Sequence, residues 1–183
     1  MKNFLKSNSY YIIRLIGTQV GLTIFAMMLG FASATVSTTM LLISSVASVL
    51  FYLWLLYSTC WEMGIKNAER IEAGRLHQSM YHGFFVCIAA YAPVILLLVL
   101  LWIGYFAGNG NLYHVVRWLV YFVFSMYHGI VRAVVGSAEN MQTLLLPLLY
   151  TVSLLPGIVT CGVAYVLGRK GIALFFKPKQ SVE

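Results

Sequence analysis

Four long apolar runs constrain the fold of this chain more than any other feature of its sequence. They extend over residues 15–33, 39–60, 83–106 and 143–168. Each is close to or above the ~20 residues that a helix needs to cross the hydrocarbon core of a bilayer. Strands of a membrane barrel would instead alternate apolar and polar side chains over about ten positions. The runs therefore predict an all-α integral membrane protein.

The composition supports a chain that is almost entirely membrane domain. Only 9% of its 183 residues are charged, 61% are hydrophobic, and the mean hydropathy is +0.85. The longest polar stretch between the runs, residues 61–82, is too short to form a soluble domain of its own. We expect a single membrane domain over 1–183, with a cytoplasmic loop at 61–82 and a basic tail at 169–183.

The formal net charge of +7 would suggest nucleic-acid binding in a soluble protein. Here the basic residues lie mostly beside the apolar runs, where such residues orient the chain and contact lipid headgroups. We expect a bilayer with an anionic inner leaflet as the partner, and no nucleic acid. With no Asp, few Glu and no C-x-x-C pair, the sequence predicts no metal site. The three cysteines are interpreted as isolated small apolar packing residues.

The segment 113–135 carries polar residues at steps of three and four positions, which places them on one face of a helix. These candidate site residues are His114, Arg117, Tyr121, Ser125, His128 and Arg132. Between membrane spans such a face would be costly and therefore functional. At the membrane surface it would be solvated or paired with lipid phosphates.

The placement of this segment decides the topology. If it spans the membrane, the basic C-terminal tail lies outside. If it lies in the outer interface or re-enters, every basic residue except Arg117 and Arg132 lies on the cytoplasmic side. The positive-inside tendency favours the second arrangement. We predict four transmembrane helices with an external amphipathic interfacial or re-entrant helix and both termini in the cytoplasm; five spans are the alternative.

The same segment leaves one cofactor alternative open. His114 and His128 are 14 residues apart, which is almost four turns, or about 21 Å along a straight helix. Stacked histidines at this spacing could hold haem if a second copy in a homodimer supplied the other ligands. No facing span offers a further histidine, so the sequence predicts no cofactor.

Two other patterns indicate contacts between helices or with partners. Gly17 and Gly21 form G-x-x-x-G, which allows close helix approach within the molecule or between copies. Charged residues pair at helical spacing after the second run, Glu62 with Lys66 among them, and predict a helical extension of that run and a candidate cytoplasmic docking surface. The candidate docking residues are Glu62, Lys66, Glu69, Arg70 and Arg75.

Two stretches of the sequence carry a family resemblance. They are YSTCWEMGIKN at residues 57–67 and GVAYVLGRKG at residues 162–171. Together they resemble motifs in small multi-pass bacterial membrane proteins of unknown function. The resemblance implies an uncharacterised bacterial multi-pass protein and brings no activity with it.

No catalytic or ligand-binding motif is recognised, so the sequence favours a protein that is not an enzyme. We expect an accessory or scaffold subunit of a complex in the cell (inner) membrane, acting with a membrane protein partner or as a homo-oligomer. The alternative is a small oligomeric transporter or channel-like protein that uses the polar face His114–Arg132.

Overall fold

The computed structural model describes residues 2–74, 82–108, 110–136 and 144–172, and every regular element in these ranges is helical. The elements are α1 (Lys2–Ala34), α2 (Thr38–Glu72), α3 (His82–Phe106), α4 (Gly110–Val123), the short 3-10 helix η1 (Ser125–Tyr127), α5 (His128–Val135), α6 (Leu145–Ser153) and α7 (Leu155–Arg169).

Among the described residues, four helical segments are long and apolar enough to cross a membrane, or five if the bent pair Gly110–Val123 and Ser125–Val135 counts as one span. All regular elements in these ranges are helical, which confirms the all-α prediction. The four segments are Asn8–Ala34 of α1, the whole of α2, the whole of α3, and α6 together with α7. The second extends well past the apolar run at 39–60, because the charged segment after it continues as helix to Glu72. At 1.5 Å per residue, the 35 residues of α2 reach about 52 Å, more than the ~30 Å of a hydrocarbon core.

The last apolar run is broken beside Pro156, the second of its two prolines. α6 ends at Ser153 and α7 begins at Leu155, so that Pro156 lies in the first turn of the new helix. Proline is favourable there because it has no N–H to donate. Pro93 and Pro147 lie inside α3 and α6 without ending those helices.

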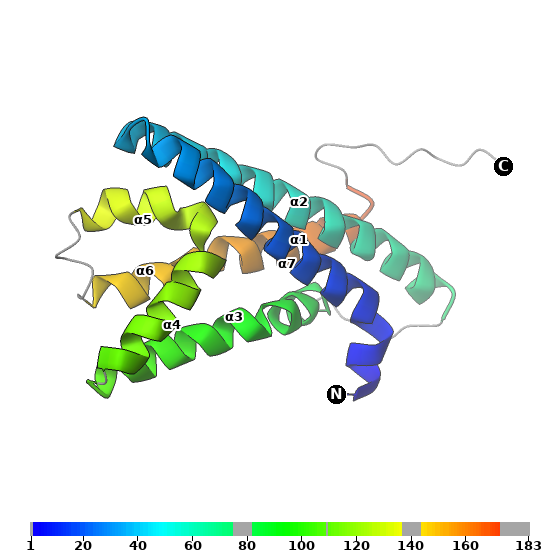
Figure 1. Cartoon of the computed structure of the whole chain (residues 1–183). Coiled ribbons are helices and arrows are strands. Elements are labelled where there is room, and N and C mark those ends of the chain that lie inside the picture. Colours follow the sequence, from blue (N-terminus) through cyan, green and yellow to red (C-terminus); the bar gives the residue numbers. More distant parts are fainter. Residues whose placement is uncertain (1, 75–81, 109, 137–143, 173–183) are drawn as a thin grey trace.

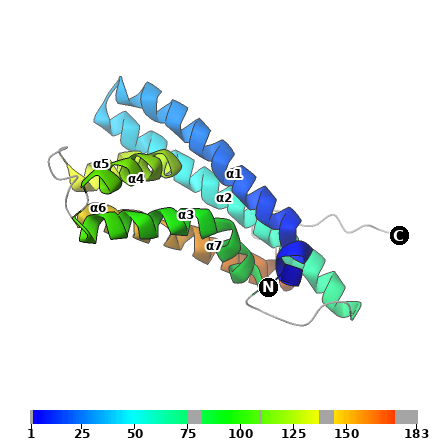
Figure 2. The same cartoon turned by 60° about the horizontal axis from the view of Figure 1, so that its bottom comes forward.

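The long helices run side by side and share two ends (Figures 1 and 2). We call one the Ser37 end: it holds the turn between α1 and α2, the end of α3 and the start of α6. We call the other the Glu72 end: it holds the starts of α1 and α3 and the ends of α2 and α7. At Ser37 the hydroxyl oxygen accepts a 3.1 Å hydrogen bond from the Met40 N–H and caps α2.

The predicted continuous amphipathic helix at 113–135 is wrong. The segment forms α4, η1 and α5, and its two halves, Gly110–Val123 and Ser125–Val135, are bent by 80° relative to each other. α4 leaves the Ser37 end, meets α5 near the middle of the bundle, and α5 returns to the same end (Figure 1). The six polar residues therefore do not share one straight face.

A close helix contact in the interior uses glycines that were not predicted as packing residues. α2 packs most extensively against α7. A Cβ atom added at Gly64 would lie 2.5 Å from the Tyr165 carbonyl oxygen and 3.0 Å from the Gly168 Cα. The two backbones therefore touch at this crossing, as they can only where side chains are absent.

The predicted pair of packing glycines lies elsewhere. A Cβ atom added at Gly17 or Gly21 would meet no atom within 4 Å apart from its own helix and neighbours. Both residues are exposed on α1, so the expectation that they pack within the molecule is wrong. Their use between copies remains a prediction.

The three cysteines are not isolated, contrary to the interpretation of the sequence. Cys60 of α2, Cys87 of α3 and Cys161 of α7 are all buried as free thiols. All three belong to one hydrophobic core cluster. A thiol-reactive fluorophore should therefore label the protein only as it unfolds, which provides a measure of stability.

Candidate functional site

A cavity lies between α1 and the bent pair of α4 and α5. Its volume is about 460 Å³. We call it the α1–α4 pocket, and its lining residues are Ala26, Met27, Gly30, Phe31, Ala34, Arg117, Trp118, Tyr121, Phe122, Ser125 and His128. Most of these side chains are apolar, with a few polar groups on one side, which is the usual make-up of a small-molecule site.

The α1 wall of the pocket is made of small residues. Ala26, Gly30 and Ala34 recur every four positions and so lie on one face of α1. The spacing of Ala26 and Gly30 would allow close helix packing, but here it leaves room beside α4. A Cβ atom added at Gly30 would meet only the Leu41 Cδ1, at 3.9 Å. Eight residues of helix span about 12 Å, so the pocket occupies the half of α1 near the Ser37 end.

The α4–α5 wall provides the polar groups. Arg117, Tyr121, Ser125 and His128 all line the pocket and are each half-buried. The Tyr121 and His128 rings lie edge to face, with centroids 5.4 Å apart. Four of the six predicted site residues are therefore brought together, although the bend separates them onto three elements.

The other two predicted residues lie outside the pocket. His114 and Arg132 are exposed, and neither lines the cavity. His114 lies on α4, whereas His128 begins α5 beyond the 80° bend. The straight helix on which the two histidines would have stacked for haem ligation does not exist, so that geometric argument for haem is wrong.

Arg117 is the unusual group of the pocket. Its Nε atom is buried without a hydrogen-bond partner in the described structure, and its guanidinium carbon lies 6.0 Å from the centre of the Tyr113 ring. The described carboxylates, Glu62, Glu69 and Glu72, all belong to the other end of the bundle. A partly buried cation without a carboxylate nearby is costly unless another anion pairs with it.

The bend beside the pocket is held by three hydrogen bonds to α1 and α2. The Thr23 hydroxyl donates to the Val123 carbonyl at 3.1 Å, and the Ser125 hydroxyl donates to the Thr23 carbonyl at 2.8 Å. The Gly129 N–H donates to the Ser45 hydroxyl oxygen at 2.8 Å. A helix break exposes backbone groups that need partners in an apolar interior. Thr23 and Ser45 supply them.

Replacing Ser45 by alanine should destabilise the bend. The Gly129 N–H would lose its acceptor in a buried position, which costs about 1–3 kcal/mol. Ser44→Ala is the matched control, because the Ser44 hydroxyl donates only within α2, to the Leu41 carbonyl. Thermal labelling of the buried cysteines should show a lower melting temperature for Ser45→Ala than for Ser44→Ala. Equal melting of the two variants would contradict this role for Ser45.

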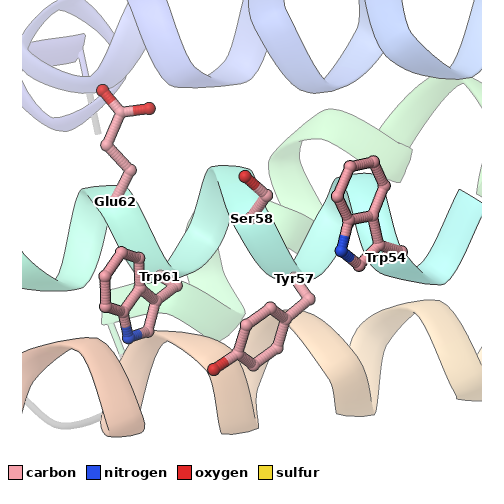
Figure 3. Close-up of a pocket in the computed structure, with 5 residues that line it drawn as sticks. All are labelled: Trp54, Tyr57, Ser58, Trp61 and Glu62. Carbon is pink, nitrogen blue, oxygen red and sulfur yellow. The ribbon is translucent and has the colours of Figure 1, made fainter. Parts of the chain in front are cut away.

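A second, smaller cavity of about 200 Å³ lies on the outside of α2. Its lining residues are Trp54, Tyr57, Ser58, Trp61 and Glu62 (Figure 3). They recur at steps of three and four positions, so a single helix face supplies all of them. The Trp61 ring N–H donates to the Ile172 carbonyl at 2.9 Å. This arrangement fits aromatic residues at a membrane surface, which anchor a helix.

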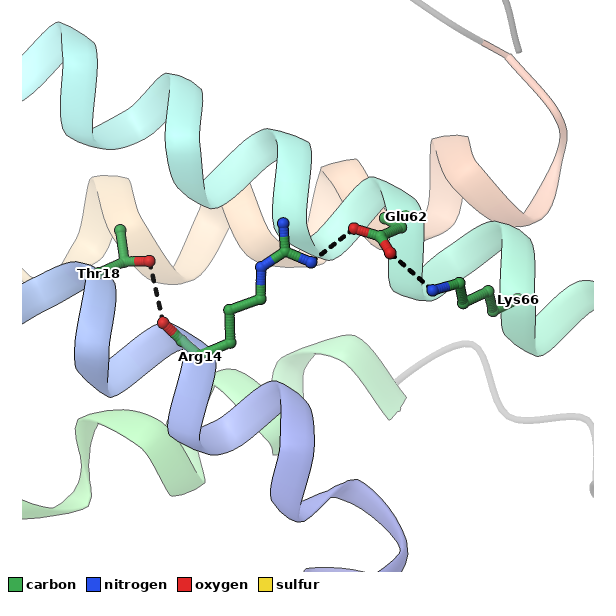
Figure 4. Close-up of polar contacts among 4 residues, drawn as sticks. All are labelled: Arg14, Thr18, Glu62 and Lys66. Carbon is green, nitrogen blue, oxygen red and sulfur yellow. Dashed lines mark hydrogen bonds and ion pairs between the residues drawn. The ribbon is translucent and has the colours of Figure 1, made fainter. Parts of the chain in front are cut away.

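The predicted docking residues divide into two groups. Glu62 joins α1 to α2: one carboxylate oxygen accepts from Arg14 at 2.6 Å and the other from Lys66 at 2.7 Å (Figure 4). The predicted Glu62–Lys66 pairing is thus confirmed, and it serves contacts within the chain. Glu69 and Arg70 are exposed near the end of α2, and Arg75 lies outside the described residues.

The described residues offer no geometry for binding a metal ion. Among the described residues, no group of three or more His, Cys, Asp or Glu side chains could hold a metal ion. The polar pocket residues are instead a cation, hydroxyl groups and an imidazole, which together suit recognition of an anion.

The fold and the pocket define a class: an all-helical protein with four helices able to cross a membrane and a cavity beside a sharply bent helix pair. Comparison of the chain with protein-family models, curated proteins and solved structures found no match. The resemblance to small bacterial membrane proteins therefore stays a prediction.

Proposed function

We propose that this is a multi-pass membrane protein that binds an amphiphilic molecule of the bilayer in the α1–α4 pocket, as the binding step of a small transporter. The single observation that carries the proposal is the pocket itself. It combines an apolar α1 wall with the side chains of Arg117, Tyr121, Ser125 and His128. An apolar tail would contact the first wall and a polar head the second.

In the proposed topology, four segments span the membrane and α4–α5 re-enters from the Ser37 end. Two features support it: the pair begins and ends at the same end of the bundle (Figure 1), and its broken backbone is satisfied within the protein. Non-helical backbone at membrane depth is tolerated where protein surrounds it. Arg14, Lys66, Arg70 and Arg169 lie toward the Glu72 end, which supports a cytoplasmic location for that end and for both termini.

Lateral access to the pocket supports an amphiphile rather than a water-soluble ligand. Phe31, Trp118 and Phe122 line the cavity and yet are 65%, 69% and 48% exposed. The pocket thus continues into the apolar outer surface of the bundle. In a bilayer this surface faces lipid, so membrane lipids are the molecules that reach the pocket most directly.

Occluding the pocket tests the proposal. Gly30→Trp should fill the cavity, whereas Gly17→Trp places the same side chain in open space on the same helix. Native mass spectrometry of the full chain in detergent, with added phospholipid, should show bound lipid in the wild type and in Gly17→Trp but not in Gly30→Trp. Equal lipid binding by both variants would contradict the proposal.

The accessory-subunit function remains a second proposal, supported by the length of α2. Its last turns extend beyond a membrane thickness and expose Glu69 and Arg70. Extraction from the native membrane, followed by mass spectrometry of co-purified proteins, tests it. A stoichiometric membrane protein that is lost on Glu69→Ala with Arg70→Ala would support docking there. A protein purified free of other chains would contradict it.

A further inference from the structure

We infer that the amphiphile is an acidic phospholipid, held with its phosphate against the guanidinium of Arg117. This rests on the proposed function, because it names the ligand of the same pocket. Two observations carry it: the charge balance around Arg117, and the apolar wall that α1 provides beside it.

The charge balance favours a ligand with a net negative charge. Arg117 lines the pocket, and its Nε is buried without a hydrogen-bond partner in the described structure. No described carboxylate lies within ion-pair distance of it. The Tyr113 ring contributes only a cation–π contact at 6.0 Å. Among the described residues the positive charge of the pocket therefore has no carboxylate partner. An acidic lipid would neutralise this charge, and a zwitterionic lipid would not.

The chemistry of the group favours phosphate. The planar guanidinium offers several N–H donors in a fork that matches two oxygens of one phosphate. The phosphate of a phospholipid is also the anionic group that lies nearest the hydrocarbon boundary. Arg117 is seven residues from the start of α4 at the Ser37 end, or about 10 Å of helix. It is thus placed to meet a headgroup from that leaflet.

The α1 wall provides the contact surface for an acyl chain of the phospholipid. Met27, Gly30 and Phe31 provide apolar surface on the opposite side of the cavity, and the small residues leave the width for an acyl chain. A cavity of about 460 Å³ holds only part of a phospholipid. The remainder would follow the exposed side chains of Phe31 and Trp118 into the surrounding bilayer.

The experiment compares probes and matched variants. Full-length protein in neutral detergent is titrated with phosphatidylglycerol, phosphatidylcholine or inorganic phosphate, and bound lipid is quantified by native mass spectrometry. We expect wild-type protein to bind phosphatidylglycerol about tenfold more tightly than phosphatidylcholine, because both lipids carry the phosphate but only phosphatidylglycerol has a net negative charge. Arg117→Gln should abolish that preference. Arg132→Gln removes the same charge from an exposed position outside the pocket and should retain it.

The outcomes separate this inference from the proposed function. Equal binding of the two lipids by the wild type, with loss of both in Gly30→Trp, would overturn the acidic-lipid inference and leave the proposed function standing. No binding of either lipid would overturn both. Inorganic phosphate that competes at the same concentration as phosphatidylglycerol would identify a free anion as the ligand and overturn the inference. If Arg117→Gln does not fold, Arg117→Lys is the alternative variant. It should bind phosphatidylglycerol more weakly than the wild type does but still prefer it to phosphatidylcholine. An affinity for phosphatidylglycerol equal to that of the wild type would overturn the guanidinium contact.

Discussion

Replacing Gly64 by leucine is expected to lower the free energy of unfolding by about 3 kcal/mol or more, because the new side chain would overlap backbone that cannot move independently. Its Cβ would lie 2.5 Å from the Tyr165 carbonyl oxygen and 3.0 Å from both the Arg169 nitrogen and the Gly168 Cα. α2 and α7 would have to separate at their most extensive contact.

Gly17→Leu is the control for this prediction. It introduces the same side chain in a long apolar helix where an added Cβ meets nothing within 4 Å. Thermal unfolding in detergent, followed by labelling of Cys60, Cys87 and Cys161, should show a large loss for Gly64→Leu and little change for Gly17→Leu. If Gly17→Leu instead altered the oligomer size, contact between copies through α1 would gain support. Similar melting of both variants would contradict the close α2–α7 crossing.

Replacing Gly129 by leucine should disrupt both the fold and the pocket. A Cβ atom there would lie 2.8 Å from the Leu41 carbonyl carbon and 2.5 Å from the Ser45 hydroxyl oxygen. α5 would move away from α2 and lose the Gly129–Ser45 hydrogen bond. The overlap and the lost bond together should cost about 3 kcal/mol, and His128, adjacent in sequence, should leave its place in the pocket wall.

Gly110→Leu is the matched control, since it lies at the start of α4 with open space around it. Leucine has a better helix propensity than glycine by about 0.8 kcal/mol, so this variant should be neutral or slightly more stable. Lipid binding by native mass spectrometry should be lost in Gly129→Leu and retained in Gly110→Leu. Retained lipid binding in Gly129→Leu would show that the pocket does not depend on the packing of α5 against α2.

Local patterns predicted the parts of the structure that depend on local physics. The continuous apolar runs predicted four helices able to cross a membrane, because hydrophobicity over about 20 residues sets that length. The spacing of Glu62 and Lys66 predicted their ion pair, since residues four apart on a helix are neighbours. Pro156 lies in the first turn of α7, just after the break from α6, where a residue without an N–H is tolerated.

The candidate site was predicted only in part. The polar face included Arg117, Tyr121, Ser125 and His128, all of which line the pocket, but it also included the exposed Arg132 and His114. The α1 wall was missed as a pocket wall. Its small residues carried a signal, the four-residue spacing of Ala26 and Gly30, but that spacing predicts close packing as readily as it predicts space.

The sequence by itself determined the helical class, the number of long apolar helices and the identity of most polar groups, because each depends on composition and periodicity along the chain. Only the tertiary structure decided that the segment 113–135 bends by 80°. No proline marks the bend, and the polar periodicity continues through it. The backbone groups released there are instead satisfied by Thr23, 100 residues away from Val123, and by Ser45, 84 residues away from Gly129. A pattern within one segment holds no information about such distant partners, and these contacts place the polar groups beside α1.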